Sequence, residues 1–122
     1  MSKGARPREW RFYLEDMAAF TRKVLKYTAG VSEAEFVNDE LLFDATLRNL
    51  ELIGEAATHV PPDIRLRFPD IPWRMVIATR NRLIHAYLGI DTHTVWSIIS
   101  TDLPALLRAI EAMQRHLDEK RP

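Results

Sequence analysis

No cysteine occurs among the 122 residues, and glycine is scarce, with four residues in the whole chain. The missing thiols exclude disulfide bonds and thiolate zinc sites. A chain of this length buries enough surface on folding to be stable without such cross-links. We therefore expect one domain spanning residues 1–122.

Long apolar runs are also lacking, because no stretch approaches the roughly 18 apolar residues of a membrane helix. The first residues are basic but have no apolar core of a secretion signal, so we expect a cytoplasmic protein that contacts no membrane. Basic and acidic side chains balance at 17 each. That balance argues against a protein that coats nucleic acid by bulk attraction.

The charges are nevertheless distributed unevenly along the chain. Residues 31–60 contain one basic and seven acidic side chains, whereas residues 61–90 contain five basic and two acidic ones. We therefore expect a local cationic cleft on an otherwise balanced protein.

Apolar residues recur along most of the chain with the period of an amphipathic helix. They recur at steps of three and four, and glycine or proline follows where the pattern stops. The pattern predicts four main helices, near residues 10–27, 38–60, 73–88 and 91–119. A short turn is expected at residues 33–36, and a single helical turn between the prolines of residues 61–72. Mostly short connections between such helices indicate an all-α, antiparallel bundle of four to five helices.

Three details of the helix ends can be predicted. Asn38 is suited to cap the second helix, because its side chain can accept a hydrogen bond from a free backbone N–H. Pro104 interrupts the last helix, so we expect a kink or a fresh start capped by Thr101 or Asp102. Gly54 lies on the apolar side of the second helix and is expected to allow close helix packing.

Residues 80–89, at the end of the third predicted helix, read RNRLIHAYLG and gather a cation, an amide, an imidazole and a phenol. An imidazole can move the proton of a ribose 2′-hydroxyl or of a leaving oxygen, and a guanidinium can stabilise charge on a phosphorane. This set suits phosphodiester cleavage without a metal. Arg80 and His85 lie about 140° apart on an ideal helix, so a groove between two copies of the chain would bring them together.

A purely structural reading of the same residues is open. His85 could cap or fill a helix end, and Arg80 could pair with a carboxylate of the acidic second helix. Glu51 and Glu55 lie one turn apart on that helix and are candidates for pairing with Arg80 or Arg82.

Further arginines surround the motif. Arg65, Arg67 and Arg74 flank its helix and Arg82 lies within it; they could extend a track for the RNA backbone or be solvated charges.

The remaining histidines and tryptophans indicate no additional site. His59, His93 and His116 have no metal-ligand spacing, so we expect surface histidines, no metal site and no cofactor. Trp73 and Trp96 could stack on bases, but their positions on apolar stripes are more typical of a core.

The stretch RNRLIHAY resembles the signature of the HEPN superfamily, and the tyrosine two residues after the histidine resembles the HepT-like toxins. Other segments are similar to the same family, namely RNLELIGEAA at 48–57, IPW at 71–73 and DLPALL at 102–107. The resemblance covers essentially the whole chain.

This resemblance implies a HEPN-like bundle that forms a homodimer, with the motifs of both protomers lining a shared cleft. It also implies a metal-independent ribonuclease toxin of a type VII toxin–antitoxin module. Arg80 and His85 would be catalytic and Asn81 the supporting polar residue. A cognate nucleotidyltransferase antitoxin would neutralise the toxin by transferring AMP to Tyr87. The alternatives are a catalytically silent helical module that partners a nucleotidyltransferase or binds nucleotide, and a plain dimerising scaffold.

Overall fold

A computed structural model describes residues 8–85 and 90–120 of the chain. Every regular element in these two ranges is helical, so the expected all-α fold is confirmed. Within the same ranges no helix is both long and apolar enough to cross a bilayer.

The first long helix, α1 (Trp10–Thr28), follows the predicted stripe. Leu14, Met17 and Val24 on this stripe are buried. The chain then turns at Gly30, whose φ of 74° lies in the left-handed region that glycine adopts without strain.

The expected short turn is a complete small helix, α2 (Glu33–Asn38). Ser32 and Glu35 form a reciprocal capping box at its start, and the Ser32 hydrogen bonds lower the pKa of Glu35. The prediction that Asn38 caps the next helix, α3 (Glu40–Thr58), is wrong. Asn38 is the last residue of α2 and donates to Ala34 O, whereas Asp39 accepts from Leu42 N and caps α3.

Two short helices connect the longer ones. Helix α4 (Pro62–Arg67) forms the expected turn in the proline-rich crossing. Helix α6 (Thr92–Ser97) is capped by Asp91, whose side chain accepts from His93 N and Thr94 N. The motif helix, α5 (Trp73–His85), lies between them, and the predicted extension of this helix to residue 88 falls outside the described residues.

The predicted interruption before Pro104 has an unexpected form. A π-helical turn, η2 (Ile98–Asp102), joins α6 to α7 (Leu103–Glu119). The predicted capping at residues 101–102 is wrong, because Asp102 has helical backbone angles and no side chain caps α7. Leu103 N–H bonds to Ile98 O instead, five residues back. This wider turn accommodates Pro104, which has no N–H to donate.

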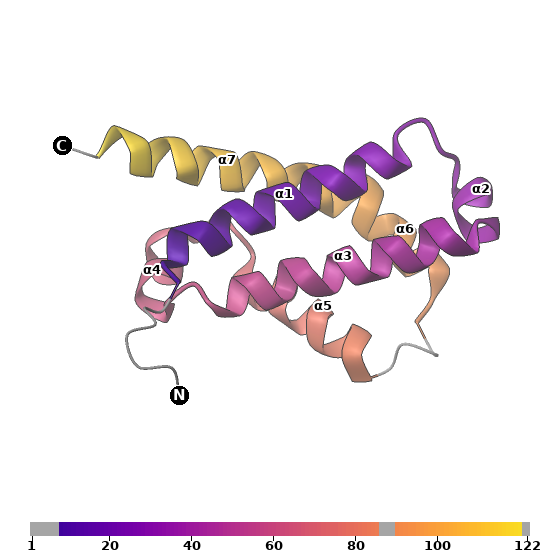
Figure 1. The fold of residues 1–122 in the computed structure, drawn as a ribbon, viewed down its shortest axis with the longest axis horizontal. Coiled ribbons are helices and arrows are strands. Elements are labelled where there is room, and N and C mark those ends of the chain that lie inside the picture. Colours follow the sequence, from indigo (N-terminus) through magenta and orange to yellow (C-terminus); the bar gives the residue numbers. More distant parts are fainter. Residues whose placement is uncertain (1–7, 86–89, 121–122) are drawn as a thin grey trace.

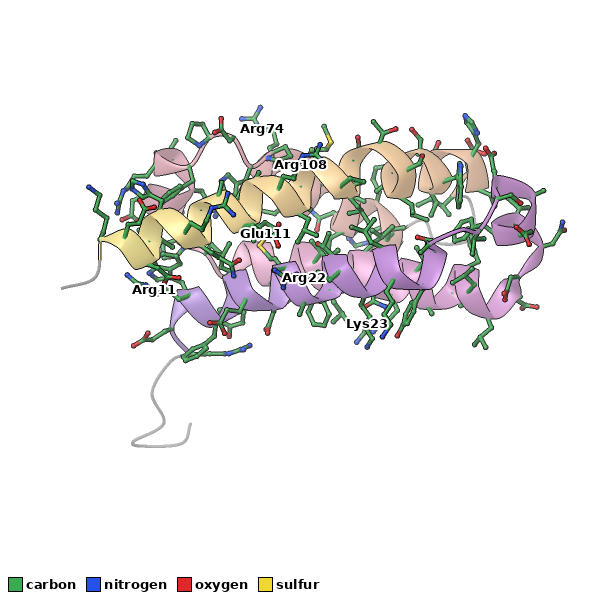
Figure 2. All side chains as sticks on the ribbon, turned by 90° about the horizontal axis from the view of Figure 1, so that it is seen from above. Arg11, Arg22, Lys23, Arg74, Arg108 and Glu111 are labelled. Carbon is green, nitrogen blue, oxygen red and sulfur yellow. The ribbon has the colours of Figure 1, made fainter. Side chains whose placement is uncertain are left out.

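Figure 1 shows α1 between α7 and α3, with α5 on the opposite side of α3. The core lies between the long helices and includes Met17, Ile53 and Ile110. Figure 2 shows Arg22 of α1 beside Glu111 of α7, an ion pair of 3.0 Å that links these two helices at the surface. Between α2 and α6, His93 pairs with Glu33 at 3.0 Å, and this pairing raises the pKa of the histidine.

Candidate functional site

The motif helix α5 crosses α3 at Gly54. A Cβ atom on Gly54 would overlap Arg80 Cβ and lie 2.9 Å from Arg80 Cγ and 3.0 Å from Val76 O. Only glycine leaves room for this approach, so the predicted packing role of Gly54 is confirmed. The stem of Arg80 thus lies directly on the backbone of α3.

The Arg80 guanidinium is held by two neighbours. Its Nη2 forms an ion pair with Glu55 Oε2 at 2.8 Å, and its Nη1 donates a hydrogen bond to Asn81 Oδ1 at 2.9 Å. Its Nε is buried and has no hydrogen-bond partner among the described residues. The side chain is 31% exposed, so the charged end reaches solvent while the stem is covered. The expected pairing of Arg80 with the acidic second helix is therefore confirmed for Glu55.

The same expectation is wrong for Glu51. This carboxylate pairs with Arg48 of its own helix at 3.2 Å. The two glutamates are four residues apart, and Glu55, next to Gly54, is the one placed at the point where the helices touch.

His85 ends α5 and is exposed, as are Asn81 and Arg82. An exposed histidine is not a core residue, which removes one structural reading of the motif. Asn81 and His85 are four residues apart, so they lie on the same face of α5. Tyr87 lies outside the described residues.

A wide groove of about 1080 Å³ runs between α4 and the outer face of α5 and ends at Asn81. Among the described residues, the polar side chains that line it are arginine and asparagine, with no carboxylate, and the others are mostly aliphatic or proline. The lining residues are Pro62, Arg65, Leu66, Pro69, Ile71, Pro72, Trp73, Arg74, Met75, Ile77, Ala78 and Asn81.

The predicted RNA-track arginines do not form one continuous row. Arg65 and Arg74 line the groove, and Figure 2 shows Arg74 at the outer edge of the bundle. Arg65 is anchored by its Nε, which donates to Val60 O at 2.9 Å. Arg67 instead lies over the Phe68 ring, and Arg82 lines a separate small hollow beside Thr79 and Ile98.

Sequence reasoning missed one extension of the site. His59 stacks on Tyr13 with ring centroids 4.3 Å apart, and its Nε2 lies 3.4 Å from Glu55 Oε1. The four-residue spacing of Glu55 and His59 could have indicated the pair. No local pattern could have placed Tyr13 of α1 beside them.

The other expectations about histidines and tryptophans can be compared directly with the structure. His59, His93 and His116 are exposed, as predicted. Trp73 is buried and its indole donates to Phe68 O at 3.0 Å, whereas Trp96 is half-buried against Phe36. Trp73 is thus a core residue, as expected, and Trp96 packs partly against the core.

Residues 17–113 match the family model described as "Ribonuclease HepT-like". The chain is 35% identical over 104 residues to "Putative RNase MJ1380" of Methanocaldococcus jannaschii, covering 85% of this chain and 95% of that relative. It is 34% identical over 108 residues to "Probable ribonuclease HepT" of Thermococcus cleftensis, covering 88% and 98%. No solved structure matches the chain significantly. The extent of these matches, which include the motif helix, shows that the chain belongs to the HepT-like ribonuclease family.

Proposed function

We propose that this protein cleaves RNA without a metal ion, with Arg80 and His85 as catalytic residues and Asn81 as the supporting residue. The main observation behind this proposal is the restrained position of Arg80. Its guanidinium is held between Glu55 and Asn81, one and a half turns before an exposed histidine. Preorganised donors stabilise developing charge at little reorganisation cost.

The reaction needs a proton transfer and an anion stabiliser. When the ribose 2′-oxygen attacks phosphorus and the bond to the 5′-oxygen breaks, the 2′-oxygen loses a proton and the 5′-oxygen gains one. The imidazole of His85 is suited to one of these transfers. The guanidinium of Arg80 can bind two oxygens of the phosphorane. Arg67 and Arg82 lie outside the groove between α4 and α5 and would contact neighbouring phosphates.

The substrate class can be tested by comparing RNA with DNA of the same sequence in the presence of EDTA. We expect cleavage of the RNA alone, because DNA lacks the 2′-hydroxyl. Cleavage of the DNA as well as the RNA, or a strict need for added metal, would contradict the proposed chemistry. Product sizes on a denaturing gel provide the measurement.

We also propose that the active form is a homodimer that covers the groove between α4 and α5. Leu66 and Met75 line this groove, and their side chains are 82% and 57% exposed. Large exposed apolar side chains gathered on one face are typical of a protein interface. A second copy here would also bring a second motif close to the first.

Replacing both Leu66 and Met75 with glutamate is expected to convert the dimer to monomers, because each protomer would then have to bury two carboxylates in place of two apolar side chains, at a large cost in desolvation. Light scattering should then give the 14.2 kDa of a single chain in place of twice that mass. The control is Leu41→Glu, which changes an 81% exposed leucine at the other end of the bundle. A wild-type monomer, or a double variant that stays dimeric, would contradict this interface.

The resemblance to HepT-like toxins supports a further proposal, that the protein is the toxin of a type VII toxin–antitoxin module. A cognate nucleotidyltransferase antitoxin would transfer AMP to Tyr87, two residues after His85. The nucleotide would add bulk and negative charge beside the motif, and so block the binding of substrate phosphate.

Incubation with the antitoxin and ATP is expected to raise the intact mass by one or more AMP units and to stop RNA cleavage. Tyr87→Phe removes the acceptor hydroxyl and should prevent the mass increase. Tyr27→Phe is a suitable control, since Tyr27 is a 39% exposed tyrosine on α1. A mass gain that persists in Tyr87→Phe would exclude Tyr87 as the acceptor.

A further inference from the structure

The carboxylate of Glu55 connects the acidic helix α3 to the motif helix α5. One oxygen forms an ion pair with Arg80 Nη2 at 2.8 Å, and the other lies 3.4 Å from His59 Nε2. His59 itself is stacked on Tyr13 of α1. The carboxylate therefore lies between Arg80 and His59.

This ion pair is poorly suited to stabilise the fold. Glu55 is 47% exposed and Arg80 is 31% exposed, and ion pairs in contact with solvent contribute little to the free energy of folding. The ion pair instead restrains the orientation of the Arg80 guanidinium. An arginine side chain has many rotamers, and here Gly54 allows the stem to lie on α3 while Glu55 and Asn81 each hold one Nη atom.

The contacts leave donors available for a substrate. Each Nη atom of an arginine carries two N–H groups. Among the described residues, Asn81 accepts one hydrogen bond from Nη1, and Glu55 forms an ion pair with Nη2 through one oxygen. At least one N–H on each Nη is therefore left for the two oxygens of a phosphate. The carboxylate thus restrains the guanidinium without using all of its hydrogen bonds.

We propose that Glu55 is a positioning residue that holds the Arg80 guanidinium in its catalytic orientation, with Gly54 providing the clearance that this orientation needs. This inference rests on the proposed ribonuclease function. Glu55 acts through Arg80 and does not itself touch the scissile phosphate.

The test is a kinetic comparison of the full-length protein with Glu55→Gln, Glu55→Asp and Glu51→Gln on one RNA oligonucleotide. Glu55→Gln is expected to lower kcat about 10- to 100-fold with little change in KM, because misplacement of a catalytic group by about 1 Å costs on the order of 10²-fold. Glu55→Asp retains the charge and should give an intermediate rate. Glu51→Gln is the matched control, since its carboxylate pairs with Arg48, and its rate should equal that of the wild type.

A double-mutant cycle separates positioning from an independent role. If Glu55 acts only through Arg80, Glu55→Gln should cause no additional loss in an Arg80→Ala background. Thermal melting of each variant shows whether the protein is folded. Gly54→Ala should also lose activity, but the steric overlap at Arg80 would affect stability as well, so the test relies on Glu55.

Four results would overturn the inference: a wild-type rate in Glu55→Gln, a faster rate, a change in KM alone, or an equal additional loss in Arg80→Ala. The faster rate would mean that Glu55 withholds Arg80 from the substrate. If the wild-type protein itself leaves RNA intact, the proposed function fails. If the wild type cleaves RNA and Glu55→Gln cleaves it equally well, only the present inference fails.

Discussion

Replacing His85 with alanine is expected to lower the rate of RNA cleavage about 10²- to 10⁴-fold, the usual contribution of a general acid or base. His85 is exposed at the last turn of α5, so the fold does not depend on packing of its ring. The loss should therefore appear in kcat, with an unchanged melting temperature. Initial cleavage rates in EDTA give the measurement.

The chain offers a matched control for this substitution. His93 is also exposed, but it lies on α6, outside the motif, and pairs with Glu33 of α2. His93→Ala should cleave RNA at the wild-type rate. Cleavage by His85→Ala that stays within a few fold of the wild-type rate would contradict the assigned role of His85.

The largest expected effect on stability comes from Phe36. This side chain is fully buried and joins α2 to α3 and α6, with its ring centroid 5.5 Å from Phe43 and 5.3 Å from Trp96. Phe36→Ala should reduce the free energy of unfolding by about 3–5 kcal/mol. Domains are usually stable by only about 5–15 kcal/mol, so the variant should be close to unfolding.

Urea denaturation measures this change, as a lower midpoint with a similar slope. The control is Val37→Ala at the next position, where the side chain is 41% exposed and the expected change is within about 0.5 kcal/mol. A loss below about 1 kcal/mol in Phe36→Ala would show that the α2–α6 end is not packed as described.

Much of the fold follows from local chemistry that can be read in the sequence. The apolar stripe of α1 and the stop at Gly30 specify one helix, and the prolines after Val60 end another. Gly54 in an otherwise apolar stripe correctly indicated a close helix contact. These features depend on residues within one or two turns of each other, which is why the sequence pattern predicts them.

Other features depend on competition between neighbours or on tertiary contacts. Asn38 and Asp39 are both good capping residues, and the end of α2 decides that Asp39 caps α3. The helical pattern does not distinguish a kink from the π-helical turn before Pro104. Arg80 pairs with Glu55 and not with Glu51 because of where α5 crosses α3. The sequence pattern of each helix does not give the position of that crossing.

The most direct test of catalysis by Arg80 is the integrity of single-stranded RNA incubated with the purified protein in EDTA, in parallel with Arg80→Ala. We expect the wild-type protein to cleave the RNA and Arg80→Ala to leave it largely intact. RNA that stays intact with folded, dimeric wild-type protein would contradict the proposed ribonuclease function and favour a helical binding module without catalytic activity. Equal cleavage by both proteins would place the catalytic groups elsewhere.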